Sequence, residues 1–71
     1  MADWQDDERL NATDKDILEL LEAGRETRGS LVDNIGKHET TISPRLKWLR
    51  EWGYVRYYHE PTGLYELADD Q

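Results

Sequence analysis

The chain has 71 residues and a net charge of −7, and its sequence contains no cysteine. A chain of this length forms one small domain with a marginal hydrophobic core, and the missing cysteines exclude disulfides and cysteine-based metal sites. The first ten residues are acidic without an apolar run, and no segment of the sequence approaches membrane-spanning length. We therefore expect a cytoplasmic domain that has no signal peptide and no membrane contact.

The acidic charge lies mainly at the two ends of the chain. Four acids fall within the first eight residues and three within the last six, whereas residues 9–65 carry nine acids and nine bases. Segment 37–60 has a net charge of +2, so the overall acidity does not exclude nucleic acid as a partner. An acidic surface with only three lysines favours adaptation to concentrated salt, and the alternative is an ordinary acidic domain.

Residues 1–10 form an acidic arm that contains Trp4. A tryptophan in such a polar stretch usually packs on something. Its ring can lie on the first helix of its own domain, or it can contact a second subunit. The second option predicts a homodimer built through the arm.

Two helices are predicted in the first half of the chain. The first spans 13–24: Thr13 is its hydroxyl cap, acids follow in the first turn, and Gly24 ends it. The second spans 29–35, is capped by Thr27 or Ser30, and ends at a glycine. The polar residues before it can lend a third strand to a sheet.

A third helix is predicted over 40–52, between Gly36 and Gly53. Its apolar residues recur at i, i+4 and i+7 and share one core-facing side: Ile42, Leu46 and Leu49. Pro44 cannot donate its amide. A helix that starts at Thr40 or Thr41 tolerates this proline near its first turn, whereas a helix that starts at His38 is expected to kink.

Residues 54–59 and 64–68 are predicted to form a β-hairpin. The turn between them contains Pro61, which presets φ, and Gly63, which can take the left-handed conformation. A two-stranded hairpin is marginal alone, so we expect it to pack on the helices, through Val55, Tyr57 and Leu67. An acidic tail, 69–71, follows.

This order of elements resembles the winged helix-turn-helix superfamily of transcription regulators over about residues 10–68. The residues that carry the resemblance are Gly36, His38, Thr40, Thr41, Ser43, Leu46, Leu49 and Gly53. With its acidic composition, the chain is most similar to the small winged-helix regulators of halophilic archaea, including PhiH-type phage repressors. The resemblance implies a mainly α-helical (α+β) domain over 11–68, with three helices and a two- or three-stranded wing.

The resemblance also implies a sequence-specific regulator of transcription, a repressor, that binds double-stranded DNA. Helix 40–52 would read the major groove, and wing 54–68 would touch the backbone or the minor groove. The candidate DNA-binding residues lie on these two elements and at the corner before the helix: Lys37, His38, Thr40, Thr41, Ser43, Pro44, Arg45, Lys47, Trp48, Arg56, His59 and Thr62. Arg45 is the leading candidate, because its planar fork can grip phosphate or guanine.

A second interpretation is a winged helix that binds protein through Trp48 and the acidic surface. Trp48 stands where the superfamily more often has a small or polar residue, and an exposed tryptophan often marks a protein contact. Each basic residue among the DNA-binding candidates, considered alone, could equally be an ordinary side chain exposed to solvent. The sequence indicates no enzyme, cofactor, metal or small-molecule ligand, since it has no glycine-rich phosphate loop and its two histidines, His38 and His59, are isolated.

Overall fold

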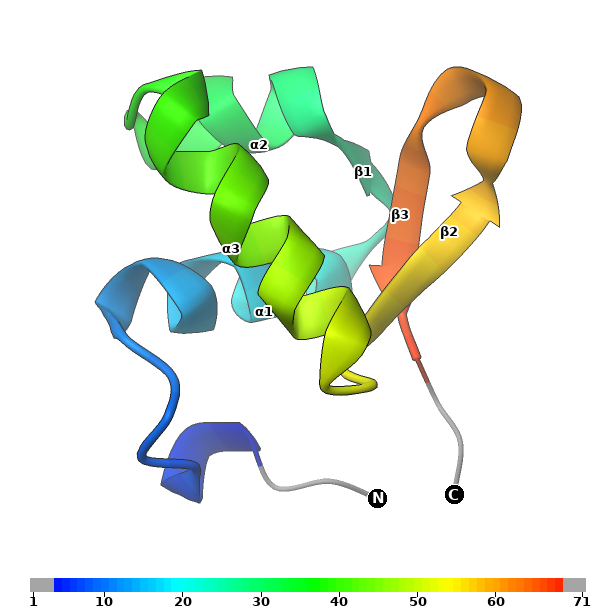
Figure 1. Ribbon diagram of the computed structural model, residues 1–71. Coiled ribbons are helices and arrows are strands. Elements are labelled where there is room, and N and C mark those ends of the chain that lie inside the picture. Colours follow the sequence, from blue (N-terminus) through cyan, green and yellow to red (C-terminus); the bar gives the residue numbers. More distant parts are fainter. Residues whose placement is uncertain (1–3, 69–71) are drawn as a thin grey trace.

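Within residues 4–68, which the computed structural model describes, three helices pack together and carry a small antiparallel sheet (Figure 1). The helices are α1 (Ala12–Ala23), α2 (Arg28–Ile35) and α3 (Glu39–Glu51). The strands are β1 (Glu26–Thr27), β2 (Val55–His59) and β3 (Leu64–Leu67), and two single 3-10 turns are η1 (Trp4–Asp6) and η2 (Glu60–Thr62). This is the predicted winged helix-turn-helix architecture, with β1 as the third strand.

Capping boxes start α1 and α2. The side chain of Asn11 accepts the amide of Asp14 at 2.8 Å, and the Asp14 carboxylate accepts the amide of Asn11 at 3.0 Å. The predicted cap of α1 was therefore wrong, because Thr13 is buried inside the first turn of the helix. At α2, Thr27 and Ser30 form the equivalent reciprocal pair, which confirms Thr27 as the cap.

A tight corner joins α2 to α3. Gly36 has φ 79°, in the left-handed region that favours glycine. His38 then caps α3, since its Nδ1 accepts the amide of Thr40 at 3.1 Å. The helix starts at Glu39 and continues through Pro44, which has no amide hydrogen to donate to the Thr40 carbonyl.

The sheet has the order β1-β3-β2, so β3 is its central strand (Figure 1). Val55 pairs with Leu67, and Tyr57 with Tyr65, in the antiparallel hairpin formed by β2 and β3. The turn between them runs through η2 to Gly63, whose φ of 67° is the predicted left-handed conformation. This hairpin is the wing.

The core lies between the three helices and the inner side of the sheet. The side chains buried most completely come from the apolar stripes of the helices: Ile17, Leu18, Leu31, Ile42, Leu46 and Leu49. The sheet adds Val55 and Tyr65, which are also buried, whereas Tyr57 and Leu67 are half-buried beside them. The prediction that the hairpin packs through its apolar residues is confirmed, and Tyr65 is the residue it missed.

The described part of the N-terminal arm packs on the same core. Trp4 and Leu10 are only 8% and 6% exposed and belong to the core cluster. The Trp4 side chain is therefore buried within its own chain. The predicted tail, 69–71, and the start of the arm, 1–3, lie outside the described residues.

Candidate nucleic-acid interface

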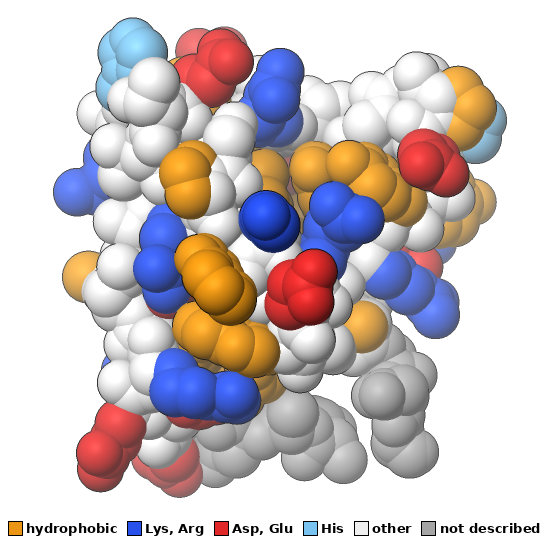
Figure 2. All heavy atoms as spheres, viewed as in Figure 1, with side chains coloured by type: hydrophobic (Ala, Val, Ile, Leu, Met, Phe, Trp, Pro, Cys, Tyr) orange, Lys and Arg blue, Asp and Glu red, His pale blue; other side chains and the backbone are white. Residues whose placement is uncertain are grey.

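One face of α3 is exposed, as the spacing of its residues predicts. Ile42, Leu46 and Leu49 are buried against the core. The predicted site residues on the opposite side are exposed, and they are Thr40, Thr41, Pro44, Lys47 and Trp48, which we call the outer face of α3. Figure 2 shows hydrophobic side chains lying among Lys and Arg side chains over this part of the molecule.

Positive charge borders the outer face. Among residues 4–68, the ion pairs do not involve Lys37, at the helix-turn-helix corner, or Lys47 and Arg50, on α3. All three side chains belong to exposed residues, and the Arg50 guanidinium lies 4.6 Å from the centre of the Tyr57 ring of β2. Cations that are not neutralised by a neighbouring carboxylate are the ones available to phosphates.

Arg28, at the start of α2, also reaches α3. Its Nη1 lies 3.5 Å from the hydroxyl oxygen of Ser43, and its Nη2 lies 3.8 Å from the carboxylate of Glu39. Both carboxylate and guanidinium are well exposed, so this pair contributes little to stability. The contact nevertheless places the Arg28 guanidinium beside the half-buried Ser43, at the edge of the outer face.

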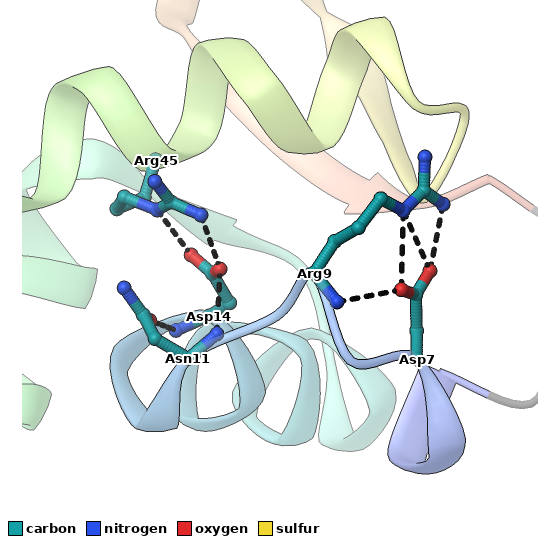
Figure 3. A network of polar contacts seen from close by, with 5 residues as sticks. All are labelled: Asp7, Arg9, Asn11, Asp14 and Arg45. Carbon is teal, nitrogen blue, oxygen red and sulfur yellow. Dashed lines mark hydrogen bonds and ion pairs between the residues drawn. The ribbon is translucent and has the colours of Figure 1, made fainter.

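Arg45, the leading candidate for DNA contact, turns instead toward α1 (Figure 3). Its Nε donates to Oδ1 of Asp14 at 2.7 Å, and its Nη2 donates to Oδ2 at 2.6 Å. Asp14 is fully buried, and the Arg45 side chain is 24% exposed. These hydrogen bonds to Asp14 raise the pKa of Arg45, against the smaller opposing effect of its partial burial. Two guanidinium nitrogens are thus bound inside the fold rather than presented on the outer face.

The carboxylate of Glu66, on β3, binds two arginines, Arg56 on β2 and Arg25 just before β1. Arg56 Nε donates to Glu66 at 2.7 Å, and Arg25 Nε donates to the other oxygen of the same carboxylate at 3.2 Å. The hydrogen bond from Arg56 is the main reason why the pKa of Glu66 lies below its usual value. The Arg25 guanidinium also lies 3.7 Å from the centre of the exposed Tyr58 ring. The charge of Arg56, which is predicted to contact DNA from the wing, is therefore partly neutralised by Glu66.

The tip of the wing carries the other two predicted wing residues. His59 Nδ1 lies 2.9 Å from the Thr62 hydroxyl oxygen, and both residues are exposed. Their mutual contact shapes the turn, and their exposure leaves them accessible to a partner.

The arm is tied to the far end of α3 by Asp7. Arg9 donates to this carboxylate through Nε and Nη2, the latter at 2.6 Å, and the Tyr54 hydroxyl donates to it at 2.5 Å. The Arg9 hydrogen bond chiefly lowers the pKa of Asp7, and the hydrogen bond to Asp7 chiefly raises the pKa of Tyr54. The Arg9 guanidinium also lies 4.7 Å from the centre of the Trp52 ring, which stacks on Trp48 with a centroid distance of 5.8 Å.

No group of three His, Asp or Glu side chains in residues 4–68 is arranged to hold a metal ion. In the same part of the chain, no helix is both long enough and apolar enough to cross a membrane.

The helix-turn-helix corner, the exposed side of α3 and the β-hairpin beside it define a winged helix-turn-helix protein. The family model described as "Bacterial regulatory protein, arsR family" matches residues 13–57, which run from α1 into β2. The match covers more than half of the chain, so the chain belongs to this family and is a DNA-binding transcription regulator. Comparisons with the curated proteins and with the solved structures gave no match.

Several residues that shape this interface were not predicted. Asp14 was interpreted only as a first-turn acid, Asp7 only as part of the acidic arm, and Tyr54 only as a strand residue. Their partners lie 31 residues away for Asp14 and 47 for the Asp7–Tyr54 pair. Of these interactions, only the one between Asn11 and Asp14 could have been predicted from the sequence, because the two residues have capping-box spacing.

Replacing Asp14 with alanine tests how far the Arg45 pair holds α3 in place. The change removes the carboxylate that completes the capping box of α1 and leaves a half-buried guanidinium without its partner, so we expect the free energy of unfolding to fall by about 3 kcal/mol. Urea denaturation followed by circular dichroism measures this. Asp16→Ala, at an exposed acid of the same helix, is the matched control and should change stability by less than about 0.5 kcal/mol. Equal effects of the two substitutions would show that the pair does not hold the helix.

Proposed function

We propose that the chain is a repressor of transcription that recognises a specific double-stranded DNA sequence with the outer face of α3. The observation that carries this proposal is the division of α3 into a buried apolar side and an exposed side with hydroxyls and Lys47, which forms no ion pair within residues 4–68. A helix of this kind fits the major groove, whose width of about 12 Å admits one helix. A bound repressor would block access to the DNA that it covers.

The outer face offers distinct contacts along its length. Thr41 can donate its hydroxyl hydrogen to a phosphate or a base edge, and Lys47 can reach a phosphate or a guanine. The Thr40 hydroxyl oxygen lies 3.0 Å from Nδ1 of His38, so these two residues would meet the DNA together. Lys37 and His38 lie at the amino end of α3, where the helix dipole favours a backbone phosphate.

The roles of the arginines in this proposal differ from the roles that the sequence predicts. Arg45 acts as a positioning residue, because its bidentate bonds to Asp14 orient α3 on α1. Arg28 and Arg50 replace it as cations beside the groove-facing surface, where their exposure supports contact with phosphates. Ser43 accepts a hydrogen bond from Arg28, and its own hydroxyl hydrogen can be donated to a phosphate of the DNA backbone.

The wing supplies the second set of contacts. His59 and Thr62 are exposed at its tip, where they can touch the backbone or the minor groove. Arg56 is exposed on β2 and is bound to Glu66 through its Nε, which leaves its two terminal nitrogens as possible donors to a phosphate. We therefore assign it a weaker, sequence-independent grip on phosphate.

Two parts of this proposal are repression rather than activation of transcription, and adaptation to concentrated salt. Both rest on the composition and on the resemblance to haloarchaeal winged-helix proteins and PhiH-type repressors. A net charge of −7 repels DNA at long range in dilute salt. In molar salt the Debye length is about 3 Å, so only charges close to the phosphates count. The proposal is thus that this chain works in a concentrated salt medium.

We also propose two-fold pairing, because two copies of α3 could then read successive major grooves about one helical turn apart. Trp4 supplies no interface for this, since it is buried within its own chain. Sedimentation in molar potassium chloride should show a dimer whose fraction rises with protein concentration. A monomer that persists at high concentration rejects the pairing.

The second candidate function is binding of a protein partner, favoured by one observation. Trp48 and Tyr58 are the large hydrophobic residues left exposed in the described chain, at 47% and 53%. A partner that is lost in Trp48→Ala, while DNA binding is retained, would support this function over the first.

Lys47→Ala tests DNA binding by the outer face. If Lys47 contacts a guanine edge, binding to a duplex selected by the chain should weaken by about 1–3 kcal/mol. Fluorescence anisotropy in molar potassium chloride measures the affinity. Lys15→Ala, at a lysine of α1, is the matched control and should bind as the parent chain does. If the two variants bind equally well, the outer face of α3 is not the reading surface.

A further inference from the structure

Three exposed apolar groups form a row along the outer face of α3. They are the methyl group of Thr41, the ring of Pro44 and the ring of Trp48, at positions i, i+3 and i+7. Trp48 is 47% exposed, although a tryptophan side chain is mostly buried in folded proteins. We call these three groups the apolar stripe, and Figure 2 shows hydrophobic side chains exposed over α3.

The stripe is held in place by its surroundings. The Trp48 ring stacks on the Trp52 ring at a centroid distance of 5.8 Å and an interplanar angle of 27°. Trp52 in turn packs against the core and lies 4.7 Å below the guanidinium of Arg9. Pro44 has no free φ rotation. A rigid apolar surface of this kind loses little conformational entropy when a partner covers it.

Cations and a hydroxyl border the stripe. Lys47 is next to Trp48 in the chain, Lys37 precedes the helix, and Thr40 is next to Thr41. The partner that fits this pattern presents negative charge beside a surface with small apolar groups. The major groove of B-DNA has this arrangement, with phosphates along its edges and the C5-methyl groups of thymine as the apolar groups on its floor.

We propose that the apolar stripe reads the C5-methyl groups of thymines, so that thymines occupy the operator positions facing Thr41, Pro44 and Trp48. This inference rests on the proposed function, because it requires α3 to lie in the major groove. Its specificity comes from burial of methyl groups rather than from hydrogen bonds. The exposed Trp48 is then part of the DNA-reading surface instead of a protein contact.

The test uses duplexes that the full chain selects from a random library in molar potassium chloride. Each thymine of a selected duplex is replaced in turn by deoxyuridine, which lacks only the C5-methyl group and keeps every hydrogen-bonding atom. At each thymine that the stripe covers, we expect affinity to fall about fourfold, the effect of burying one methyl group. A methyl contact releases no counterions, so this ratio should stay constant while both affinities fall with rising salt.

Three variants connect each lost methyl group to its own residue. Thr41→Ser keeps the hydroxyl and removes the methyl group, Pro44→Ala removes the ring, and Trp48→Ala removes the exposed aromatic surface. Each should abolish the deoxyuridine effect at one position and leave it at the others. Tyr58→Ala, at an exposed aromatic residue on β2, is the control and should preserve every deoxyuridine effect. Thr41→Ser and Pro44→Ala alter only exposed side chains, so they remain informative if Trp48→Ala fails to fold.

Different outcomes would reject the reading of methyl groups alone or would reject DNA binding as well. If deoxyuridine changes no affinity, or if its effects persist in all three variants, the stripe does not read methyl groups although the chain still binds DNA. If the library yields no enriched sequence, both the inference and the proposed function fail, and a protein partner becomes the better account of Trp48.

Discussion

The bidentate pair between Asp14 and Arg45 is the constraint on which the orientation of α3 depends. Apolar burial of Ile42, Leu46 and Leu49 attaches the helix to the core, but hydrophobic contact is non-directional and permits small rotations or slides. Two parallel hydrogen bonds to a fully buried carboxylate do not permit them. A buried carboxylate left without a partner is costly, so the pair fixes which residues of α3 point outward.

Three carboxylates of this chain hold arginine side chains in place. Asp7 binds Arg9 and also Tyr54, which follows α3. Asp14 binds Arg45 in the middle of α3, and Glu66 binds one arginine on β2 and one just before β1. These carboxylates lie on α1, the arm and β3 rather than on the outer face of α3. An overall acidic chain can therefore keep Lys47 and Arg50 of α3 out of the ion pairs formed within residues 4–68. The same ion pairs hold α3 in one orientation, which the proposed reading of bases requires.

Local pattern was sufficient to predict the three helices, the Gly36 corner and the Gly63 turn, because each depends on residues close together in the chain. The exposed residues on the outer face of α3 followed from the same helical periodicity. The partner of Arg45 could not be predicted in this way, since it lies 31 residues away and many acids were equally plausible. Burial of Trp4 and Tyr65 likewise depends on how distant elements pack. The two arginines that share Glu66 meet only through the strand register, which the sequence does not specify.

Nuclear magnetic resonance of the isotope-labelled chain, titrated with a selected duplex, tests the central claim most directly. That claim is that the outer face of α3 contacts DNA while Arg45 stays bound to Asp14. Signals from Thr40, Thr41, Lys47 and the indole of Trp48 should shift, while the Arg45 Nε–H signal and the indole of buried Trp4 should not. A large shift of the Arg45 Nε–H signal, with the outer-face signals unchanged, would contradict the account.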